Sequence, residues 1–184
     1  IGVHGSNSEG YEWIYPYLTV DSSETLATFF RYSDNFCPNK IHLKLNKEIN
    51  SVLDKNKNIN EVILMGHSYG GMIVSIFSDK WIREIPLTIH TVAAPLSGPV
   101  LSDPRSGILK NICEYNPPTM IRENIDFYQW RTIKELDGIF KDLEYDPQTV
   151  KLKGSTVVRL PDTYNGKRLG HNWSLSWVAE QIVE

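Results

Sequence analysis

The sequence predicts an α/β protein, a three-layer α/β/α sandwich with a mostly parallel central sheet. Two apolar runs typical of strands, at 61–65 and 86–92, flank a segment with a helical pattern. Strand, helix and strand in succession form a βαβ unit, in which the two strands lie parallel in one sheet. The third observation is the pattern G-x-S-x-G at 66–70, which stands between the first of these strands and the helix.

The elements before this pattern follow from composition and spacing. We expect Ile1–Val3 to be the end of a strand, and the sequence does not show what precedes it. The aromatic segment 9–18 fits either a short helix closed by Pro16 or a lid-like loop, with side chains in an acyl pocket or in the core. Residues 25–32 have the β-branched and aromatic content of a strand. Residues 40–55 predict an amphipathic helix, because apolar side chains recur at helical spacing.

The helix after the pattern is expected to run to about Arg83, and the next strand covers 86–92. Residues 97–120 are rich in proline and predict loops with one short helix near 107–113. We expect this excursion to lie over the C-terminal edge of the sheet, where α/β active sites are found. It is either a lid or substrate wall, or a surface excursion that packs on itself.

The last third of the chain supplies two more strands and a closing helix. Residues 125–131 and 155–160 predict the strands, since both runs are rich in β-branched or aromatic residues. A glycine-rich loop follows at 166–172, and residues 173–184 predict the helix, with apolar side chains on one face.

Composition is ordinary for a soluble globular protein. The 184 residues predict one domain, 1–184, with 41% hydrophobic and 22% charged residues. A formal net charge of −3 gives no support for a nucleic-acid partner. No apolar run approaches the roughly 20 residues of a transmembrane helix, so we expect a soluble protein. The sequence leaves the compartment open, with the cytoplasm slightly favoured. The oligomeric state is not predicted.

The chain has two cysteines, Cys37 and Cys113. They either pair or remain buried free thiols, and we expect free thiols. No cluster of Cys and His suggests a metal site, and the chemistry predicted below needs neither a metal nor a cofactor.

The G-x-S-x-G pattern is typical of a nucleophilic serine. A serine hydroxyl is a weak nucleophile, so it must be held where a base reaches it. A sharp turn between strand and helix does this, and Gly66 and Gly70 relieve the crowding that the turn creates. The same turn puts the N–H of Tyr69 at the start of a helix, where it can donate to an oxyanion. Ser68 is therefore the candidate nucleophile.

A serine nucleophile needs an imidazole base. Of the five histidines, His42 lies in a helix pattern and His90 in a strand. We expect His67, the variable residue of the motif, to point away from Ser68, and His4 to brace its own loop. His171 remains, in a loop between the last strand and the last helix, and it is the candidate base.

The base in turn needs an acid that fixes its tautomer. The chain order serine, aspartate, histidine places this acid between Ser68 and His171. Asp137 is the best candidate, because it follows the strand at 125–131 by a few residues. Asp146 and Asp162 are rivals, the latter through an alternative topology, and we expect Asp142 to be solvated.

Four short segments together resemble the α/β-hydrolase superfamily, and most of all the small, nearly lidless bacterial serine lipases and esterases. The segments are His4-Gly5-Ser6, Gly66-His67-Ser68-Tyr69-Gly70-Gly71, Asp137-Gly138-Ile139 and Gly170-His171. The stretch at 93–98 is also similar to a segment of lipases and lipid deacylases of this superfamily. The chain departs from the pattern in its short first strand and in the charged segment around Asp137.

This resemblance implies a minimal α/β-hydrolase fold and a role for each matching residue. Ser68 is the nucleophile, His171 the base and Asp137 the acid. The backbone N–H groups of Tyr69 and Ser6 form the oxyanion hole. The implied reaction is acyl transfer through an acyl-enzyme, followed by hydrolysis.

The predicted function is therefore that of a serine hydrolase that cleaves carboxylic esters. Its partner is a small-molecule ester, with a lipid-like substrate as one option and short to medium acyl chains preferred. The alternatives are a thioesterase, amidase or acyltransferase on the same triad, or a non-catalytic binding protein of this fold.

Overall fold

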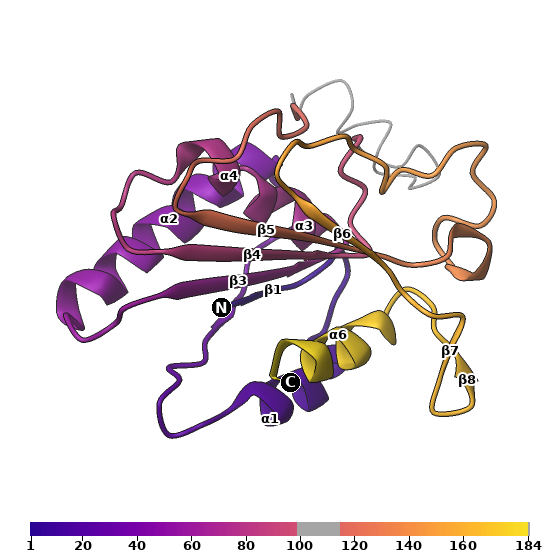
Figure 1. Cartoon of the computed structure of the whole chain (residues 1–184), viewed down its shortest axis with the longest axis horizontal. Helices are drawn as coiled ribbons and strands as arrows, with labels where there is room; N and C mark the ends of the chain where they lie inside the picture. The colour runs from indigo at the N-terminus through magenta and orange to yellow at the C-terminus, as the bar shows by residue number, and fades with distance from the viewer. Residues whose placement is uncertain (99–114, 184) are drawn as a thin grey trace.

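A six-stranded sheet forms the centre of the molecule in the computed structural model, which describes residues 1–98 and 115–183 (Figure 1). The strand order is β2-β1-β3-β4-β5-β6, and every neighbouring pair is parallel. The strands are β1 (Gly2–Val3), β2 (Phe29–Phe30), β3 (Val62–His67), β4 (Leu87–Val92), β5 (Ile125–Arg131) and β6 (Thr156–Arg159). The prediction of an α/β fold with a parallel sheet is confirmed. A separate antiparallel hairpin, β7 (Thr163–Tyr164) and β8 (Lys167–Arg168), follows β6.

Helices cover both faces of the sheet (Figure 1). One face carries α2 (Pro38–Lys55), α3 (Tyr69–Ser75) and α4 (Phe77–Lys80). The other face carries η1 (Tyr11–Trp13), α1 (Ile14–Val20) and α6 (Ser174–Val183), and α1 packs against α6. A short turn of 3-10 helix, η2 (Lys134–Leu136), follows β5.

The direction of winding reverses at β1, which lies between β2 and β3. The connection through α1 leads to one side of β1, and the connection through α2 leads back to the other side. Right-handed crossovers in opposite directions place these two helices on opposite faces of the sheet. In open α/β sheets, ligands bind at the C-terminal ends of the strands where the winding reverses. The loops after β1 and β3 are therefore the expected position of a site.

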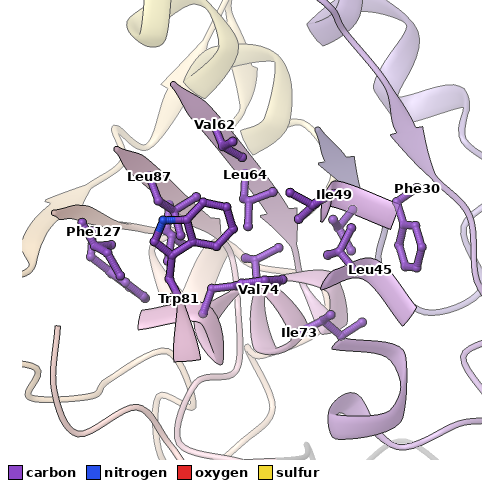
Figure 2. Close-up of a cluster of buried hydrophobic side chains, with 14 of the residues drawn as sticks. Phe30, Leu45, Ile49, Val62, Leu64, Ile73, Val74, Trp81, Leu87 and Phe127 are labelled. Atoms are coloured by element: carbon purple, nitrogen blue, oxygen red, sulfur yellow. The ribbon is translucent and has the colours of Figure 1, made fainter. Parts of the chain in front are cut away.

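The larger core lies between the sheet and α2, α3 and α4 (Figure 2). Side chains alternate between the two faces along each strand, and those of Leu64 in β3, Ile89 in β4 and Phe127 in β5 point to this face. They meet Leu45 of α2 and Trp81 after α4, and all five side chains are buried. Burial of a side chain of this size contributes about 1.5–3 kcal/mol to folding, so this core fixes α3 against the sheet.

A second core fills the opposite face. Met65, Val92 and Trp130 point to this side of the sheet and pack against Leu175 and Val178 of α6. All of these side chains are buried. Because α6 is anchored here, the loop that precedes it is held against the C-terminal edge of the sheet.

Three predicted elements differ in extent or character. The strand expected over 25–32 is limited to Phe29–Phe30, because its neighbour β1 offers only two residues for pairing. The helix expected from the serine to Arg83 is split into α3 and α4, and it ends at Lys80. Pro16 does not close the helix after residue 9 but lies in the first turn of α1, where its missing N–H costs no hydrogen bond.

Residues of the 9–18 segment divide between the core and the surface. Trp13 is buried in the second core, whereas Tyr11, Tyr15 and Leu18 are exposed. The excursion predicted over 97–120 lies mostly outside the described residues.

Cys37 is disulfide-bonded, so the expectation of a free thiol is wrong for this residue, and Cys113 lies outside the described residues. Within the described part of the chain, every helix is too short or too polar to cross a membrane.

Candidate active site

Ser68 occupies a sharp turn between β3 and α3. Its backbone has φ 52° and ψ −120°, a conformation that non-glycine residues rarely adopt. The Ser68 N–H donates to the carbonyl of Val92 at 2.9 Å, and the Ser68 carbonyl accepts from the N–H of Gly71 at 2.9 Å. These two hydrogen bonds hold the serine in a strained backbone state, which is typical of residues at functional sites.

Two glycines make this turn possible. A Cβ on Gly66 would lie 2.5 Å from the carbonyl oxygen of Gly70 and equally close to a methyl group of Val74. A Cβ on Gly70 would lie 2.1 Å from the carbonyl oxygen of Val3. Both contacts are far below van der Waals separation, so only glycine lets α3 approach β1 and β3 this closely.

The loop after β1 lies beside the serine. A Cβ on Gly5 would lie 3.0 Å from the Cβ of Ser68. His4 braces this loop, as expected from the sequence: its Nδ1 donates to the carbonyl of Gly5 at 2.7 Å, and its Nε2 accepts from the N–H of Tyr32 at 3.3 Å. The rings of His4 and Tyr32 also stack, with their centroids 4.1 Å apart. The backbone at Gly5 and Ser6 is thereby held near Ser68.

Asp137 lies just after η2, at the C-terminal end of the sheet, and its side chain is fully buried. Its carboxylate accepts four hydrogen bonds. Oδ2 accepts from the Thr132 hydroxyl at 2.7 Å and from Nδ1 of His171 at 2.9 Å. Oδ1 accepts from the N–H groups of Ile139 at 2.8 Å and Phe140 at 3.2 Å. Such a set of donors stabilises an ionised carboxylate in a dry place.

These donors decide the protonation state of Asp137. Burial alone raises the pKa of a carboxyl group. Here the hydrogen bond and the charge of His171, with the hydrogen bonds from Thr132 and Ile139, outweigh burial and lower the pKa of Asp137 below its ordinary value. The group is therefore an anion at neutral pH, beside the imidazole of His171.

A second layer of polar groups supports the carboxylate. The amide oxygen of Gln148 accepts from the Thr132 N–H at 2.9 Å, and its amide nitrogen donates to the Thr132 carbonyl at 3.1 Å. The same nitrogen donates to Asp146 at 3.1 Å. Thr132, Gln148 and Asp137 are all buried, so this network fixes the end of β5 and the direction of the carboxylate.

His171 is enclosed by side chains from three parts of the chain. Phe140 meets its ring edge to face, with the centroids 5.0 Å apart, and the ring of His67 lies 4.8 Å away on a tilt of 55°. The carbonyl of His171 accepts from Nε2 of His67 at 3.0 Å and from the Ser174 hydroxyl at 2.5 Å. Because His67 directly precedes Ser68, this contact brings the loop of His171 to the turn that carries the serine.

His67 is the residue of this cluster that sequence reasoning misses. The sequence predicts that it points away from Ser68, and it does not predict the contact of its side chain with His171. Strand alternation is the signal that identifies it: Met65 and His67 lie on the face covered by α6, and His171 stands just before α6. Burial, with the nearby charge of His171, lowers the pKa of His67 to about 3, so this ring is neutral.

The rival acids lie elsewhere. Asp146 accepts from Gln148 and reaches Asp137 only through Gln148 and Thr132. Asp162 is exposed, and its side chain meets the hydroxyl of Thr163. Asp142 is exposed and forms an ion pair with Lys141 at 3.5 Å. Among the described contacts, Asp137 is the carboxylate that reaches His171.

A cavity of about 770 Å³ lies away from this cluster. It opens at the amino-terminal ends of the strands, the edge of the sheet opposite Ser68. Its walls include Ile1, Tyr17 and Leu53, with Val62 and Ile63 at the start of β3. This cavity is therefore not a substrate pocket for the serine.

The parallel sheet, the reversal of winding at β1 and the strained serine between β3 and α3 define an α/β-hydrolase-type domain. A family model described as the PGAP1-like alpha/beta domain matches residues 16–129, more than half of the chain, and the chain belongs to this family. No curated protein matches this chain significantly. The matched range includes Ser68 and Tyr69, whereas Asp137 and His171 lie beyond it.

Proposed function

We propose that this protein is a serine ester hydrolase. Ser68 is the nucleophile, His171 the general base and Asp137 the residue that orients and stabilises the base. The N–H groups of Tyr69 and Ser6 are the proposed donors to the oxyanion. The observation that carries the proposal is the hydrogen bond from Nδ1 of His171 to the buried carboxylate of Asp137. The His171 loop is in turn hydrogen-bonded to His67, the residue next to the strained Ser68.

The proposed reaction is acyl transfer in two steps. The Ser68 hydroxyl attacks the ester carbonyl while Nε2 of His171 takes its proton. The imidazolium is stabilised by Asp137, and the tetrahedral oxyanion accepts from the two backbone N–H groups. Collapse releases the alcohol, which receives the proton from His171, and leaves an acyl-enzyme. Water, deprotonated by His171, then attacks this ester, and the acid leaves as Ser68 regains its proton.

Two features of the site support these roles. Nδ1 of His171 donates to Asp137, which leaves the lone pair of Nε2 to act as a base. Tyr69 is the first residue of α3, and the N–H groups in the first turn of a helix point out of its amino-terminal end. No hydrogen bond joins Ser68 to His171 among the described residues, and such bonds often form only when substrate is bound.

The direct test is labelling with a fluorophosphonate, which reacts with activated serines. Wild type should be labelled, and S68A should not, with both proteins folded by circular dichroism. Labelling that persists in S68A would place the reactive serine elsewhere. A folded wild type that resists the probe would point to a non-catalytic binding protein of this fold.

The substrate class is proposed to be carboxylic esters with short to medium acyl chains. A series of p-nitrophenyl esters of increasing acyl length, from acetate to palmitate, tests this because it spans esterase and lipase substrates. We expect kcat/KM to peak among the shorter chains. A steep rise with chain length, with activation at an oil–water interface, would instead favour a lipase. Thioester and amide analogues of the best ester separate the alternative reactions on the same triad.

The disulfide at Cys37 bears on the compartment. Disulfides persist in oxidising compartments and are rare in the cytoplasm. We therefore propose an oxidising compartment in place of the cytoplasm, which the sequence alone slightly favoured. Mass spectrometry of protein alkylated before and after reduction tests whether Cys37 is oxidised in cells.

A further inference from the structure

The side chain of His67 joins two parts of the candidate site that are far apart in the sequence. His67 is the last residue of β3, the strand that leads to Ser68, and its side chain is 2% exposed. Its Nε2 lies 3.0 Å from the carbonyl oxygen of His171, and 104 positions separate the two residues. Their rings also contact each other, with centroids 4.8 Å apart.

The hydrogen bond fixes the tautomer of His67. A carbonyl oxygen only accepts, so the proton of the neutral ring is on Nε2. Nδ1 then carries a lone pair, and it has no hydrogen-bond partner among the described residues. It faces the loop after β1, where a Cβ on Gly5 would lie 3.3 Å away. A buried polar atom without a partner is unfavourable, and an apolar residue at this position would avoid it. The histidine therefore serves something other than packing.

We propose that His67 is a positioning residue for His171, setting through its Nε2–H the distance between the base and Ser68. This inference rests on the proposed function. The other groups that hold His171 are Asp137 and Phe140 from the segment after β5, and Ser174 from α6. Among the described contacts of His171, the bond from His67 is the one that comes from the strand carrying the serine. It thus ties the base directly to the nucleophile.

The charge state of His67 suits this role. The titratable groups that act on it are His171, Asp137 and His4. Burial, followed by the charge of His171, disfavours protonation of His67, so it remains neutral when His171 becomes an imidazolium. A lysine or arginine would also donate to the carbonyl, but its charge would oppose the imidazolium that forms during catalysis.

Three substitutions separate the hydrogen bond from the bulk of the ring. The amide nitrogen of glutamine in H67Q can occupy the position of Nε2 and donate to the carbonyl. The shorter amide in H67N reaches only the position of Nδ1, and H67L has no donor. We expect H67Q to keep kcat within about threefold of wild type, and H67N and H67L to lose about 10- to 100-fold with KM little changed. Misplacement of a catalytic group by about 1 Å costs on this order.

A spectroscopic readout tests the same inference without turnover. The proton on Nδ1 of His171, hydrogen-bonded to Asp137, should give a low-field NMR resonance. We expect it in wild type and H67Q, and expect it shifted or broadened in H67N and H67L. The acid limb of the kcat/KM profile, measured in the same four proteins, should move in the same two variants and remain in place in H67Q.

The outcomes distinguish this inference from the function on which it rests. Wild type without S68A-sensitive ester hydrolysis would refute the proposed function, and the NMR comparison would still test the His67 contact. Equal kcat in wild type, H67Q and H67L would overturn the inference. An equal loss in H67Q and H67N would also overturn it, because the position of the donor would then not matter. If H67L does not fold, the comparison of H67Q with H67N decides between these outcomes.

Discussion

Nδ1 of His171 lies 2.9 Å from Oδ2 of Asp137, although 34 positions separate the two residues. The aspartate follows β5, next to the edge strand of the sheet, and the histidine precedes α6. Two independently anchored segments therefore meet at the C-terminal edge of the sheet, on the side where Ser68 follows β3. The fold creates this pair, since neither segment places its side chain without the sheet.

Substitution of Asp137 by asparagine tests the role of the pair. Asparagine keeps the size and an oxygen for the backbone donors at Ile139 and Phe140, but its amide would favour the wrong tautomer of His171. We expect kcat to fall by about 10³- to 10⁴-fold, with circular dichroism unchanged. Initial rates of ester hydrolysis under saturating substrate measure this effect.

D162N is the matched control, because Asp162 is exposed and makes no described contact with His171. It should retain wild-type turnover. A large loss in D162N with little loss in D137N would transfer the acid role to Asp162.

The hydroxyl of Thr132 should matter for stability. In T132V the carboxylate of Asp137 loses a donor at 2.7 Å, and valine offers no replacement. We expect a loss of about 1–3 kcal/mol in the free energy of unfolding, and a rise in the pKa of Asp137. Urea denaturation at neutral pH measures the first effect. T132S keeps the hydroxyl and should lie close to wild type, and equal destabilisation by both changes would assign the effect to packing instead.

The close approach of α3 to β1 can be tested at Gly70. In G70A the new methyl group would lie 2.1 Å from the carbonyl oxygen of Val3, so the helix has to move. We expect a destabilisation above about 3 kcal/mol or insoluble protein. G138A is the control, because nothing lies within 4 Å of the added methyl group there. Similar thermal midpoints for G70A and wild type would show that the helix shifts freely.

Stability should fall as the solution becomes acidic, because three histidines are buried in neutral form. Burial lowers the pKa of His42 and His90 to about 4 and, together with the charge of His171, that of His67 to about 3. The unfolded chain binds these protons near the ordinary histidine pKa of 6.5, whereas the folded protein does not. Unfolding therefore becomes more favourable as the pH falls from about 6.5 toward 4, and the stability present above 6.5 is lost.

His42 allows a test of this dependence away from the candidate site. It is packed against Phe77 in α4, and its Nδ1 has no partner among the described residues. H42L removes the group, so the decline of the unfolding free energy from neutral pH to about pH 4 should shrink by on the order of 3 kcal/mol. Urea titrations at each pH unit measure the slope. A slope identical to that of wild type would mean that His42 titrates normally in the folded protein.

How far the sequence determines the sheet depends on the strand. β5 can be predicted to the residue, since Ile125–Arg131 is a run rich in aromatic residues that follows a polar segment. β2 cannot, because a strand extends only as far as its neighbours can pair with it. The 25–32 run has the composition of a strand, but β1 supplies partners only for Phe29 and Phe30.

In the candidate site, too, some features can be predicted from local sequence and others depend on the whole fold. The serine turn is encoded locally, since the glycines at 66 and 70 are needed wherever such a turn forms. The choice of Asp137 among several acidic residues needs the sheet, because only the position of β5 decides which carboxylate reaches His171. The contact of His67 with His171 joins residues 104 positions apart. Strand alternation indicates the face of the sheet on which His67 lies, but only the fold places His171 beside it.

The backbone conformation at Ser68 favours the proposed catalytic role at the expense of stability. A residue with φ 52° and ψ −120° is tolerated most easily when it is glycine, so the serine makes the native state less stable than it need be. S68G should be inactive. Its free energy of unfolding should nevertheless exceed that of S68A by about 1 kcal/mol, so that it also resists heat better. Selection for stability alone, without the proposed hydrolysis, would therefore be expected to replace the serine first.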